Sequence, residues 1–243
     1  PSSAASDVYK RQALVRIATE AKDFKVVVVN DIESDLENLG YLLRYDSVYG
    51  RFEKNVNAAN QGINIDENHI RFHTEKNIID VPWEDYDLDL IIEATGVSNN
   101  VLGARDLVSK AAVPKVVVTN ADKSVDMTIV ISVNNSEYNR LTHSVVSSSI
   151  CDVNAIAPVL SILDEHFGVA SALISTLHPW LSYQNLLDGP ISSVASPGHS
   201  WSDYALGRSS VGNLIPKETT AGTATERVLP SLMGKIEAIS YRV

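Results

Sequence analysis

The sequence predicts an α/β protein in which a doubly wound sheet is followed by a smaller α+β domain. Between residues 13 and 149, strand patterns alternate with helix patterns, as expected where helices cover both faces of a mostly parallel sheet. The strand patterns are continuous apolar runs such as Val26-Val27-Val28-Val29, typical of strands buried on both faces. The alternation changes near Ser149, so we assign residues 13–149 to the first domain and 150–243 to the second.

The opening residues differ from this pattern. Residues 1–12 are small, polar and without apolar periodicity, so we interpret them as a linker or cloning artefact outside the fold. Helical spacing begins at Ala13. The predicted elements of the first domain are helices over 13–21, 36–44 and 100–112, short strands separated by turns over 52–82, and strands over 26–29, 88–93, 115–119, 127–133 and 144–149.

The second domain begins with a predicted helix over 151–166 and a strand over 170–177 that runs into His178. Residues 182–214 are long, irregular and rich in Ser and Gly, which is typical of a functional or disordered loop. A helix over 221–232 and a strand over 235–243 complete the prediction.

Composition narrows the class of protein. The net charge is −10 and Lys and Arg are not clustered, which argues against a nucleic-acid partner. No apolar run approaches the roughly 20 residues needed to span a bilayer, so we expect no membrane partner. The single cysteine, Cys151, excludes an internal disulfide and a cysteine-rich metal site, which favours a cytoplasmic protein without a metal centre.

Asp31 is the first candidate binding residue. It follows the predicted strand 26–29, and doubly wound sheets bind ligands at the carboxyl ends of their strands. A carboxylate there can accept hydrogen bonds from both ribose hydroxyls of NAD and would repel the 2′-phosphate of NADP. The alternative is an aspartate that caps a helix or a turn. The Gly-rich phosphate loop that should precede helix 13–21 is absent, so we expect the first strand and this loop to be missing.

Cys151 and His178 form the candidate catalytic pair. Cys151 begins a predicted helix, and the positive end of a helix dipole lowers the pKa of a thiol. His178 ends a separate strand, and a cysteine paired with a histidine from elsewhere in the fold is the arrangement of an activated nucleophile. The alternatives are a small buried cysteine and a structural histidine preceding Pro179.

From about residue 13 to residue 243, the chain resembles the glyceraldehyde-3-phosphate dehydrogenase family. The motifs that carry the resemblance occur in the family's order with compatible gaps, and together they are far more specific than any one of them. They are Asn30-Asp31, Tyr45-Asp46-Ser47 with Gly50 and Phe52, Glu93-Ala94-Thr95-Gly96, Ser149-Ile150-Cys151-Asp152-Val153-Asn154 with Ala157-Pro158, Leu177-His178, Leu187-Asp188-Gly189-Pro190, Ile215-Pro216 and Tyr241-Arg242-Val243.

The resemblance implies an NAD-dependent oxidation of an aldehyde, which in the family is glyceraldehyde 3-phosphate. Cys151 would attack the aldehyde, His178 would act as general base and stabilise the oxyanion, and phosphate would release the acyl group from the thioester. The resemblance also implies a homotetramer in which residues 182–214 lie against a neighbouring subunit's cofactor. The implied binding residues are Asp31, Thr95, Gly96 and Thr119 for the cofactor, and Thr219 and Arg242 for the substrate phosphate.

The departures from the family pattern fall on the anion sites. Ile150 and Asp152 replace the Ser and Thr that flank the catalytic cysteine in the family, and Leu181 replaces a phosphate-binding Thr. A carboxylate beside the nucleophile would repel a phosphate dianion and oppose formation of the thiolate. The alternative is that Asp152 caps the helix and points away.

Three readings of the function therefore stay open. The first is phosphorylating oxidation of glyceraldehyde 3-phosphate. The second is the same chemistry with another aldehyde, such as erythrose 4-phosphate, or another acyl acceptor. The third is a non-catalytic nucleotide-binding relative. The resemblance stops at Val243, where the family continues, so we expect both ends of the enzyme to be missing and residues 1–243 alone to be poorly active.

Overall fold

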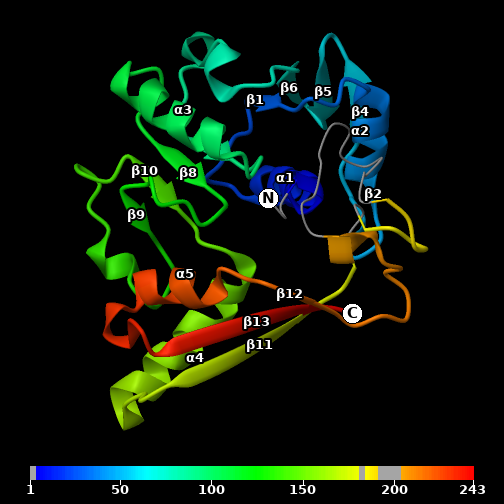
Figure 1. Ribbon diagram of the computed structural model, residues 1–243. Helices are drawn as coiled ribbons and strands as arrows, with labels where there is room; N and C mark the ends of the chain where they lie inside the picture. The colour runs from blue at the N-terminus through cyan, green and yellow to red at the C-terminus, as the bar shows by residue number, and fades with distance from the viewer. Residues whose placement is uncertain (1–3, 181–183, 191–203) are drawn as a thin grey trace.

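Strands and helices alternate along the chain, and three larger sheets organise the molecule (Figure 1). The structure is a computed structural model that describes residues 4–180, 184–190 and 204–243. Two four-stranded sheets lie in the N-terminal part of the chain, and a three-stranded sheet lies in the C-terminal part. This arrangement agrees with the predicted α/β class.

The first sheet has the strand order β1-β6-β5-β4, in which β1 and β6 run parallel and the other pairs run antiparallel. Helix α2 begins where the side chain of Asp35 accepts a hydrogen bond from the backbone N–H of Asn38, at 3.0 Å. The predicted apolar face of α2 packs against the sheet through Leu39 and Leu43. The elements are α1 (Ala4–Glu20), β1 (Val28–Asn30), α2 (Leu36–Arg44), the hairpin β2 (Tyr45–Asp46) and β3 (Gly50–Arg51), β4 (Val56–Ala59), β5 (Gly62–Ile65) and β6 (Asn68–His73).

The second sheet is entirely parallel, with the order β7-β8-β10-β9. Val101, Ala104 and Leu107 on helix α3 form a buried stripe against the β-branched strand Val116–Val118, as the helical spacing predicts. The elements are the short 3-10 helices η1 (Ile78–Asp80), η2 (Trp83–Tyr86) and η3 (Asn135–Glu137), the helix α3 (Ser98–Ser109), and the strands β7 (Ile91–Glu93), β8 (Val116–Val118), β9 (Met127–Thr128) and β10 (Val145–Ser147).

The third sheet has β13 at its centre, parallel to β11 and antiparallel to β12. Helices α4 and α5 pack against each other through a buried apolar cluster that includes Val153, Ala157, Ala224 and Val228. Helix α5 lies so close to β13 that a Cβ at Gly222 would be 3.3 Å from the carbonyl oxygen of Ile236. The elements are α4 (Cys151–Phe167), β11 (Ala172–His178), η4 (Tyr204–Gly207), β12 (Ile215–Lys217), α5 (Ala221–Val228), η5 (Pro230–Leu232) and β13 (Ile236–Arg242).

Several predicted boundaries are wrong. Helix α1 begins at Ala4 instead of Ala13, since Lys, Arg and Gln before Ala13 are good helix formers even without an apolar face. The strand predicted over 127–133 ends at Thr128, because the buried Asn134 side chain bonds to the backbone of Thr128 and Val130 and turns the chain. The helix predicted over 221–232 ends at Val228, and strand β12 was not predicted.

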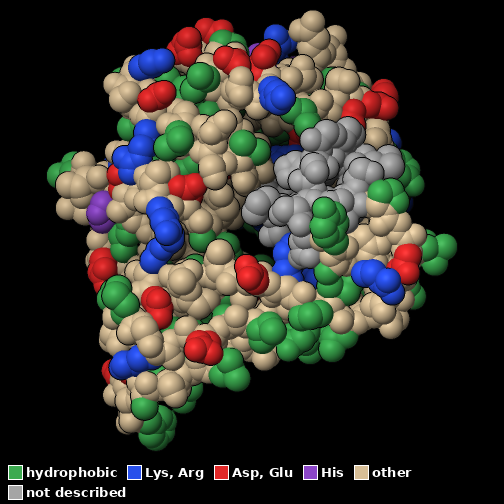
Figure 2. All heavy atoms as spheres, in the orientation of Figure 1, with side chains coloured by type: hydrophobic (Ala, Val, Ile, Leu, Met, Phe, Trp, Pro, Cys, Tyr) green, Lys and Arg blue, Asp and Glu red, His purple; other side chains and the backbone are tan. Residues whose placement is uncertain are grey.

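Among the described residues, no helix combines the length and the apolar character needed to cross a membrane. On the described part of the face in Figure 2, acidic and basic side chains are interspersed over all parts of the molecule. The charges that make up the net charge of −10 are therefore not gathered on this face into one patch of either sign.

Candidate functional site

Cys151 is the first residue of α4, directly after the tight connection that leaves β10. In this connection Ser149 is buried and has a φ of 63°, a left-handed conformation that is unusual for a residue other than glycine. The N–H of Ser149 donates to Ser147 Oγ at 2.9 Å, and this hydroxyl donates to the Asn120 carbonyl at 2.7 Å. The strained turn thus brings the thiol to the carboxyl end of the parallel sheet.

Asn154 holds this turn from the first part of the helix. Its side-chain amide donates to the carbonyls of Ser148 and Ile150, at 2.8 and 3.0 Å. Ile150 packs its side chain against the apolar cluster between α4 and α5. Sequence reasoning gave Asn154 no role of its own, although an amide three residues after a candidate nucleophile can bond to the turn that precedes the helix.

Asp152 lies between the thiol and the imidazole. Its Oδ1 atom is 3.7 Å from Cys151 Sγ and 3.1 Å from His178 Nε2, and one ligand atom from each of the three residues lies within 4.8 Å of the others. The alternative in which Asp152 points away from the site is therefore wrong. Thiolate, carboxylate and imidazole are also zinc-ligand types, and a closed structural zinc site takes four of them. The absence of a metal centre stays a prediction.

His178 is held by the sheet. It ends β11 beside Arg242 of β13, and its Nε2 atom also lies 3.2 Å from Thr176 Oγ1. Thr176 Oγ1 is in turn 2.8 Å from Ser240 Oγ on the neighbouring strand. Thr176 and His178 share a face because they are two residues apart on a strand. This hydroxyl pair was not predicted, although the two-residue spacing from His178 could have indicated Thr176.

The pKa of the Cys151 thiol is raised, not lowered. Desolvation is the largest cause, and the negative charge of Asp152 adds to it. The hydrogen bond from the Asp152 backbone N–H favours the thiolate but is outweighed. Cys151 is at the helix N-terminus as predicted, but the expectation that this position lowers its pKa is wrong, because desolvation and the adjacent carboxylate outweigh the helix dipole.

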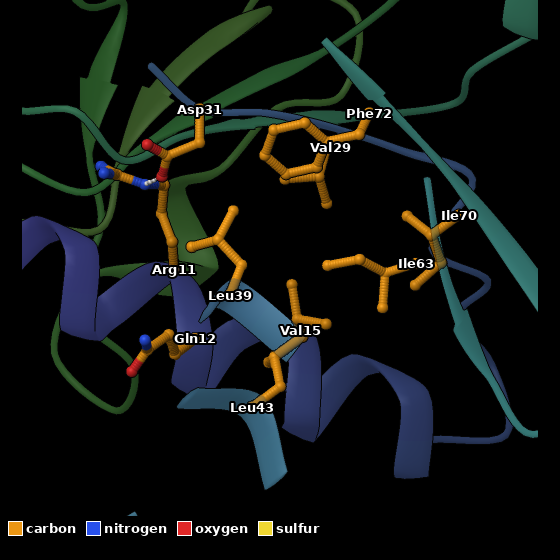
Figure 3. A pocket seen from close by; sticks show the side chains of 10 residues that line it. All are labelled: Arg11, Gln12, Val15, Val29, Asp31, Leu39, Leu43, Ile63, Ile70 and Phe72. Carbon is orange, nitrogen blue, oxygen red and sulfur yellow. Dashed lines mark hydrogen bonds and ion pairs between the residues drawn. The ribbon is translucent and has the colours of Figure 1, made fainter. Parts of the chain in front are cut away.

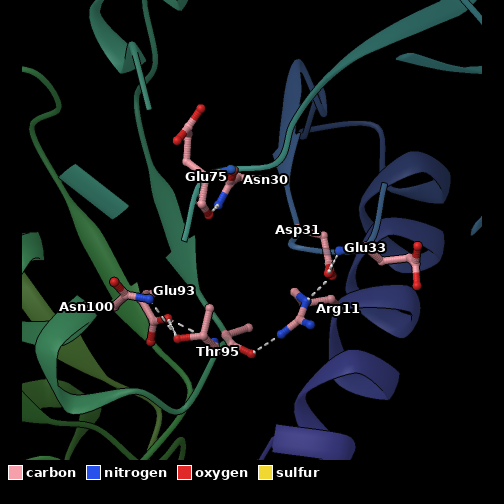
Figure 4. Close-up of polar contacts among 9 residues, drawn as sticks. Arg11, Asn30, Asp31, Glu33, Glu75, Glu93, Thr95 and Asn100 are labelled. Carbon is pink, nitrogen blue, oxygen red and sulfur yellow. Dashed lines mark hydrogen bonds and ion pairs between the residues drawn. The ribbon is translucent and has the colours of Figure 1, made fainter. Parts of the chain in front are cut away.

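Asp31 lies one residue beyond β1, as predicted, and its carboxylate forms an ion pair with Arg11 of α1 (Figure 4). The Arg11 Nε atom is 2.8 Å from Asp31 Oδ2, and its Nη1 atom donates to the Ala94 carbonyl at 2.9 Å. Arg11 therefore links the carboxyl ends of β1 and β7. Among the described residues these two strands do not pair with each other.

Thr95 and Gly96 follow β7 at the same edge. Thr95 Oγ1 contacts the buried Glu93 carboxylate and accepts hydrogen bonds from the Val97 N–H and the Asn100 amide, at 3.2 and 3.1 Å. Gly96 has a φ of 68°, which suits glycine and turns the chain toward α3. The two residues thus shape the turn between β7 and α3, with the backbone of Gly96 unobstructed by a side chain.

Polar atoms without partners gather at the carboxyl ends of β8 and β10. Thr119 Oγ1, Asn120 Oδ1 and Ser149 Oγ are buried and have no hydrogen-bond partner among the described residues. Buried polar atoms without partners are rare and call for an explanation such as a bound polar ligand. The polar edge formed by Asp31, Thr95 and these atoms fits a dinucleotide, which binds at the carboxyl ends of the strands in this type of sheet.

A separate small cavity lies between α1, α2 and the first sheet (Figure 3). Its volume is about 50 Å³, and its walls are mostly apolar, with Arg11 and Asp31 at one end. A pocket for a dinucleotide needs several hundred Å³. The cavity shares none of its lining residues with the group of Cys151, Asp152 and His178, and we assign it no ligand.

The two predicted substrate-phosphate residues lie at the third sheet. Arg242 ends β13 beside His178, and its Nη1 atom donates to the Pro179 carbonyl at 3.5 Å. Thr219 lies just beyond β12, where its Oγ1 accepts a hydrogen bond from the Ala221 N–H at 3.1 Å. Among the hydrogen bonds of the described residues, none joins the two side chains. Leu181 and, within the predicted loop, residues 182–183 and 191–203 lie outside the described part of the chain.

Comparison with known proteins defines the family. Residues 11–101 match the model described as glyceraldehyde 3-phosphate dehydrogenase, NAD binding domain, and residues 150–243 match that of the C-terminal domain. The chain is 32% identical over 230 residues, 95% of its length, to the cytosolic glyceraldehyde-3-phosphate dehydrogenase of Scenedesmus vacuolatus, of which it covers 70%. The chain belongs to the glyceraldehyde-3-phosphate dehydrogenase family. The predicted family and fold class are therefore confirmed.

Two further relatives show how much of the family's length is present. The chain is 34% identical over 224 residues to glyceraldehyde-3-phosphate dehydrogenase 2 of Streptomyces avermitilis, covering 92% of this chain and 63% of that protein. It is 34% identical over 230 residues to glyceraldehyde-3-phosphate dehydrogenase 1 of Kluyveromyces lactis, covering 95% and 66%. The chain thus spans under two thirds of the length of these relatives. Residues 4–10 of α1 precede the first residue matched to the family's NAD-binding domain.

Proposed function

We propose that this chain carries the thioester-forming chemistry of an NAD-dependent aldehyde dehydrogenase. The observation that supports this most directly is the grouping of Cys151 and His178. They come from different elements, lie at the family's motif positions, and have their ligand atoms within 4.8 Å of each other. A scaffold that only bound a nucleotide would not need a thiol and an imidazole at this distance.

In the proposed reaction the Cys151 sulfur attacks the aldehyde carbon. The proton of the thiol passes to Asp152 or His178. The aldehyde oxygen becomes the oxyanion of a hemithioacetal, which a protonated His178 would stabilise. NAD, when bound, supplies the acceptor for the hydride that leaves this carbon. A thioester then remains on Cys151. Thr176 and Ser240 keep the imidazole oriented through both steps.

The residues at the carboxyl ends of the strands would hold the cofactor. Asp31 would accept hydrogen bonds from the adenosine ribose, while Thr95, Gly96 and Thr119 would line the site. Because the Asp31 carboxylate is bonded to Arg11, ribose binding requires this contact to be exchanged for the hydroxyl groups. The unpaired Thr119 Oγ1 would gain a partner in the same event.

We propose glyceraldehyde 3-phosphate as the aldehyde, with Thr219 and Arg242 binding its phosphate. Arg242 lies beside His178, Thr219 lies just beyond β12 of the same sheet, and both residues are of types that bind phosphate well. Another phosphorylated aldehyde, such as erythrose 4-phosphate, is the second candidate for the same site. Phosphate is the acyl acceptor that the family resemblance implies, but Asp152 favours another acceptor because of its charge.

We also propose a cytoplasmic homotetramer. The unpaired cysteine is compatible with a reducing compartment. Leu173 and Leu177, on the face of β11 turned away from His178, are 77% and 68% exposed, which supports a partner subunit on this face. Light scattering coupled to gel filtration measures the oligomeric state, and substitution of both leucines by Asn should lower it. A monomeric parent protein would contradict the proposal.

The test of the chemistry follows one turnover rather than many. The chain is mixed with glyceraldehyde 3-phosphate and NAD, and NADH absorbance and the mass of the intact protein are recorded together. We expect a thioester on the parent protein, none on Cys151→Ser, and formation slowed by about 10²-fold or more on His178→Asn. A thioester-free parent protein that binds NAD would favour the non-catalytic reading.

A further inference from the structure

We propose that water, rather than inorganic phosphate, takes the acyl group from Cys151, and that Asp152 is the general base that activates this water. The inference rests on the thioester of the proposed function and concerns only the step that follows it. It comes from the position of Asp152 Oδ1, 3.7 Å from Cys151 Sγ and 3.1 Å from His178 Nε2.

The carboxylate stands where an anionic acceptor would have to approach. An acceptor attacks the thioester carbon, which is bonded directly to the sulfur, so it comes within a few ångströms of Asp152. The Asp152 side chain is only 12% exposed, but the neighbouring Cys151 is exposed, so water screens part of the carboxylate charge. Repulsion between like charges about 4 Å apart then lowers the affinity for a phosphate anion by about tenfold for each negative charge of the phosphate.

The other groups around the thiol do not restore an anion site. Ile150 directs its side chain into the apolar cluster and offers no hydroxyl group. The charge of Lys10 favours an anion at Cys151, but its effect on the thiol is weaker than that of Asp152. Arg242, the predicted ligand of the substrate phosphate, donates to the Pro179 carbonyl. The acceptor side of the site is therefore dominated by the carboxylate.

The same carboxylate favours attack by a neutral water molecule. Water next to the thioester carbon lies within hydrogen-bond reach of Asp152, which can accept its proton during the attack. His178 contacts the same oxygen atom and can take up that proton. Thr176 holds the imidazole in this position. The pair of Asp152 and His178 is thus suited to hydrolysis.

The step balances without a further reactant. The water oxygen forms a bond to the carbonyl carbon, the carbon–sulfur bond breaks, and the sulfur leaves as a thiolate. One proton of the water passes through Asp152 and His178 to this thiolate, and the second is lost when the acid ionises. The products are a carboxylate, the Cys151 thiol and one proton. The two electrons of the aldehyde have already left as hydride.

The experiment uses the 243-residue chain and needs no cofactor. p-Nitrophenyl acetate acetylates a reactive thiol, and Cys151 is the single cysteine, so the acetylated protein can be prepared and desalted. Loss of the acetyl group is followed by intact mass spectrometry with and without millimolar inorganic phosphate, and phosphorus NMR detects acetyl phosphate. Asp152→Asn and Asp152→Thr are compared with Glu165→Gln, which removes the same charge from the exposed far end of α4.

We expect the parent protein to release acetate at a rate that phosphate does not change. Both Asp152 variants should release it about 10²-fold more slowly, and Glu165→Gln should match the parent. Acetyl phosphate formed by the parent protein, or parent-rate hydrolysis by both folded Asp152 variants, would overturn the inference. Absence of any hydroxylamine-sensitive acetyl group on Cys151 would instead contradict the proposed function, on which the inference rests.

Discussion

Removing the charge of Asp152 should make Cys151 more reactive. The two charged atoms would be 3.7 Å apart, which corresponds to a repulsion of about 4.5 kcal/mol at an effective dielectric constant of 20 and about 1 kcal/mol in bulk water. Cys151 is exposed, so a value near 1–2 kcal/mol applies. Asp152→Asn should therefore lower the thiol pKa while keeping the backbone N–H of residue 152 that favours the thiolate.

The rate of alkylation measures this change at one site, because the chain has a single cysteine. Removing a repulsion of about 1–2 kcal/mol raises the thiolate fraction at neutral pH about tenfold, but a thiolate of lower pKa is a weaker nucleophile, so the net gain in alkylation rate is about threefold. The rate constant for iodoacetamide is measured across pH 6–10 (about the range in which thiols titrate) for the parent, Asp152→Asn and Glu165→Gln. If Asp152→Asn and Glu165→Gln share the parent's rate profile, Asp152 does not control the thiol.

Four other outcomes are expected. Asn154→Ala releases the turn before α4 and should cost about 1–2 kcal/mol in urea unfolding and slow alkylation of the thiol; unchanged values of both would contradict its positioning role. Ser149→Gly should leave the free energy of unfolding unchanged or raise it by up to about 1 kcal/mol. Glycine adopts the positive φ without strain, and the substitution removes a buried hydroxyl group that has no hydrogen-bond partner. A clear loss of stability would refute this expectation. Leu232→Ala, at a fully buried position, should cost about 2–5 kcal/mol, and a loss below 1 kcal/mol would show that the site collapses around the smaller side chain. Burial would raise the pKa of Asp126, but hydrogen bonds from the backbone N–H groups of Val145 and Ser144 and the ion pair with Arg105 lower it below 3.8. The stabilisation by Asp126 is therefore present above pH 3.8 and lost as pH falls through the folded value. Asp126→Asn should be less stable than the parent protein at pH 7 and should lose less stability on acidification, which acid-dependent urea unfolding measures.

The elements that the sequence predicts best are those whose local signals agree. Helix α2 has an aspartate cap, a leucine face and no competing turn, and its observed bounds of Leu36–Arg44 coincide with the prediction. Strand β8 is a run of three valines and was predicted almost to the residue. The region after Met127 shows where such signals fail. A continuous apolar pattern there predicts a strand, but hydrogen bonds made by the buried Asn134 side chain end it.

The candidate site was predictable to the level of residue types and order. The helix that begins at Cys151 and the strand that ends at His178 are both where the sequence places them. What the sequence could not show is the direction of the Asp152 side chain. A carboxylate in the first turn of a helix is favoured whether it faces solvent or the site. The fold decides, because β11 brings His178 to Asp152 Oδ1.

This one contact changes how the site should be understood. In a pair of thiol and imidazole alone, proton transfer from sulfur to nitrogen produces two opposite charges that stabilise each other. With Asp152 between them, an imidazolium would already have an anionic partner, so the thiolate would gain less from it. The charge of Asp152 also adds to desolvation, the larger cause of the raised thiol pKa. The same arrangement leaves a base in contact with the imidazole after the thioester has formed. The carboxylate thus makes formation of the Cys151 thiolate less favourable, but it supplies a base for the later deprotonation of water.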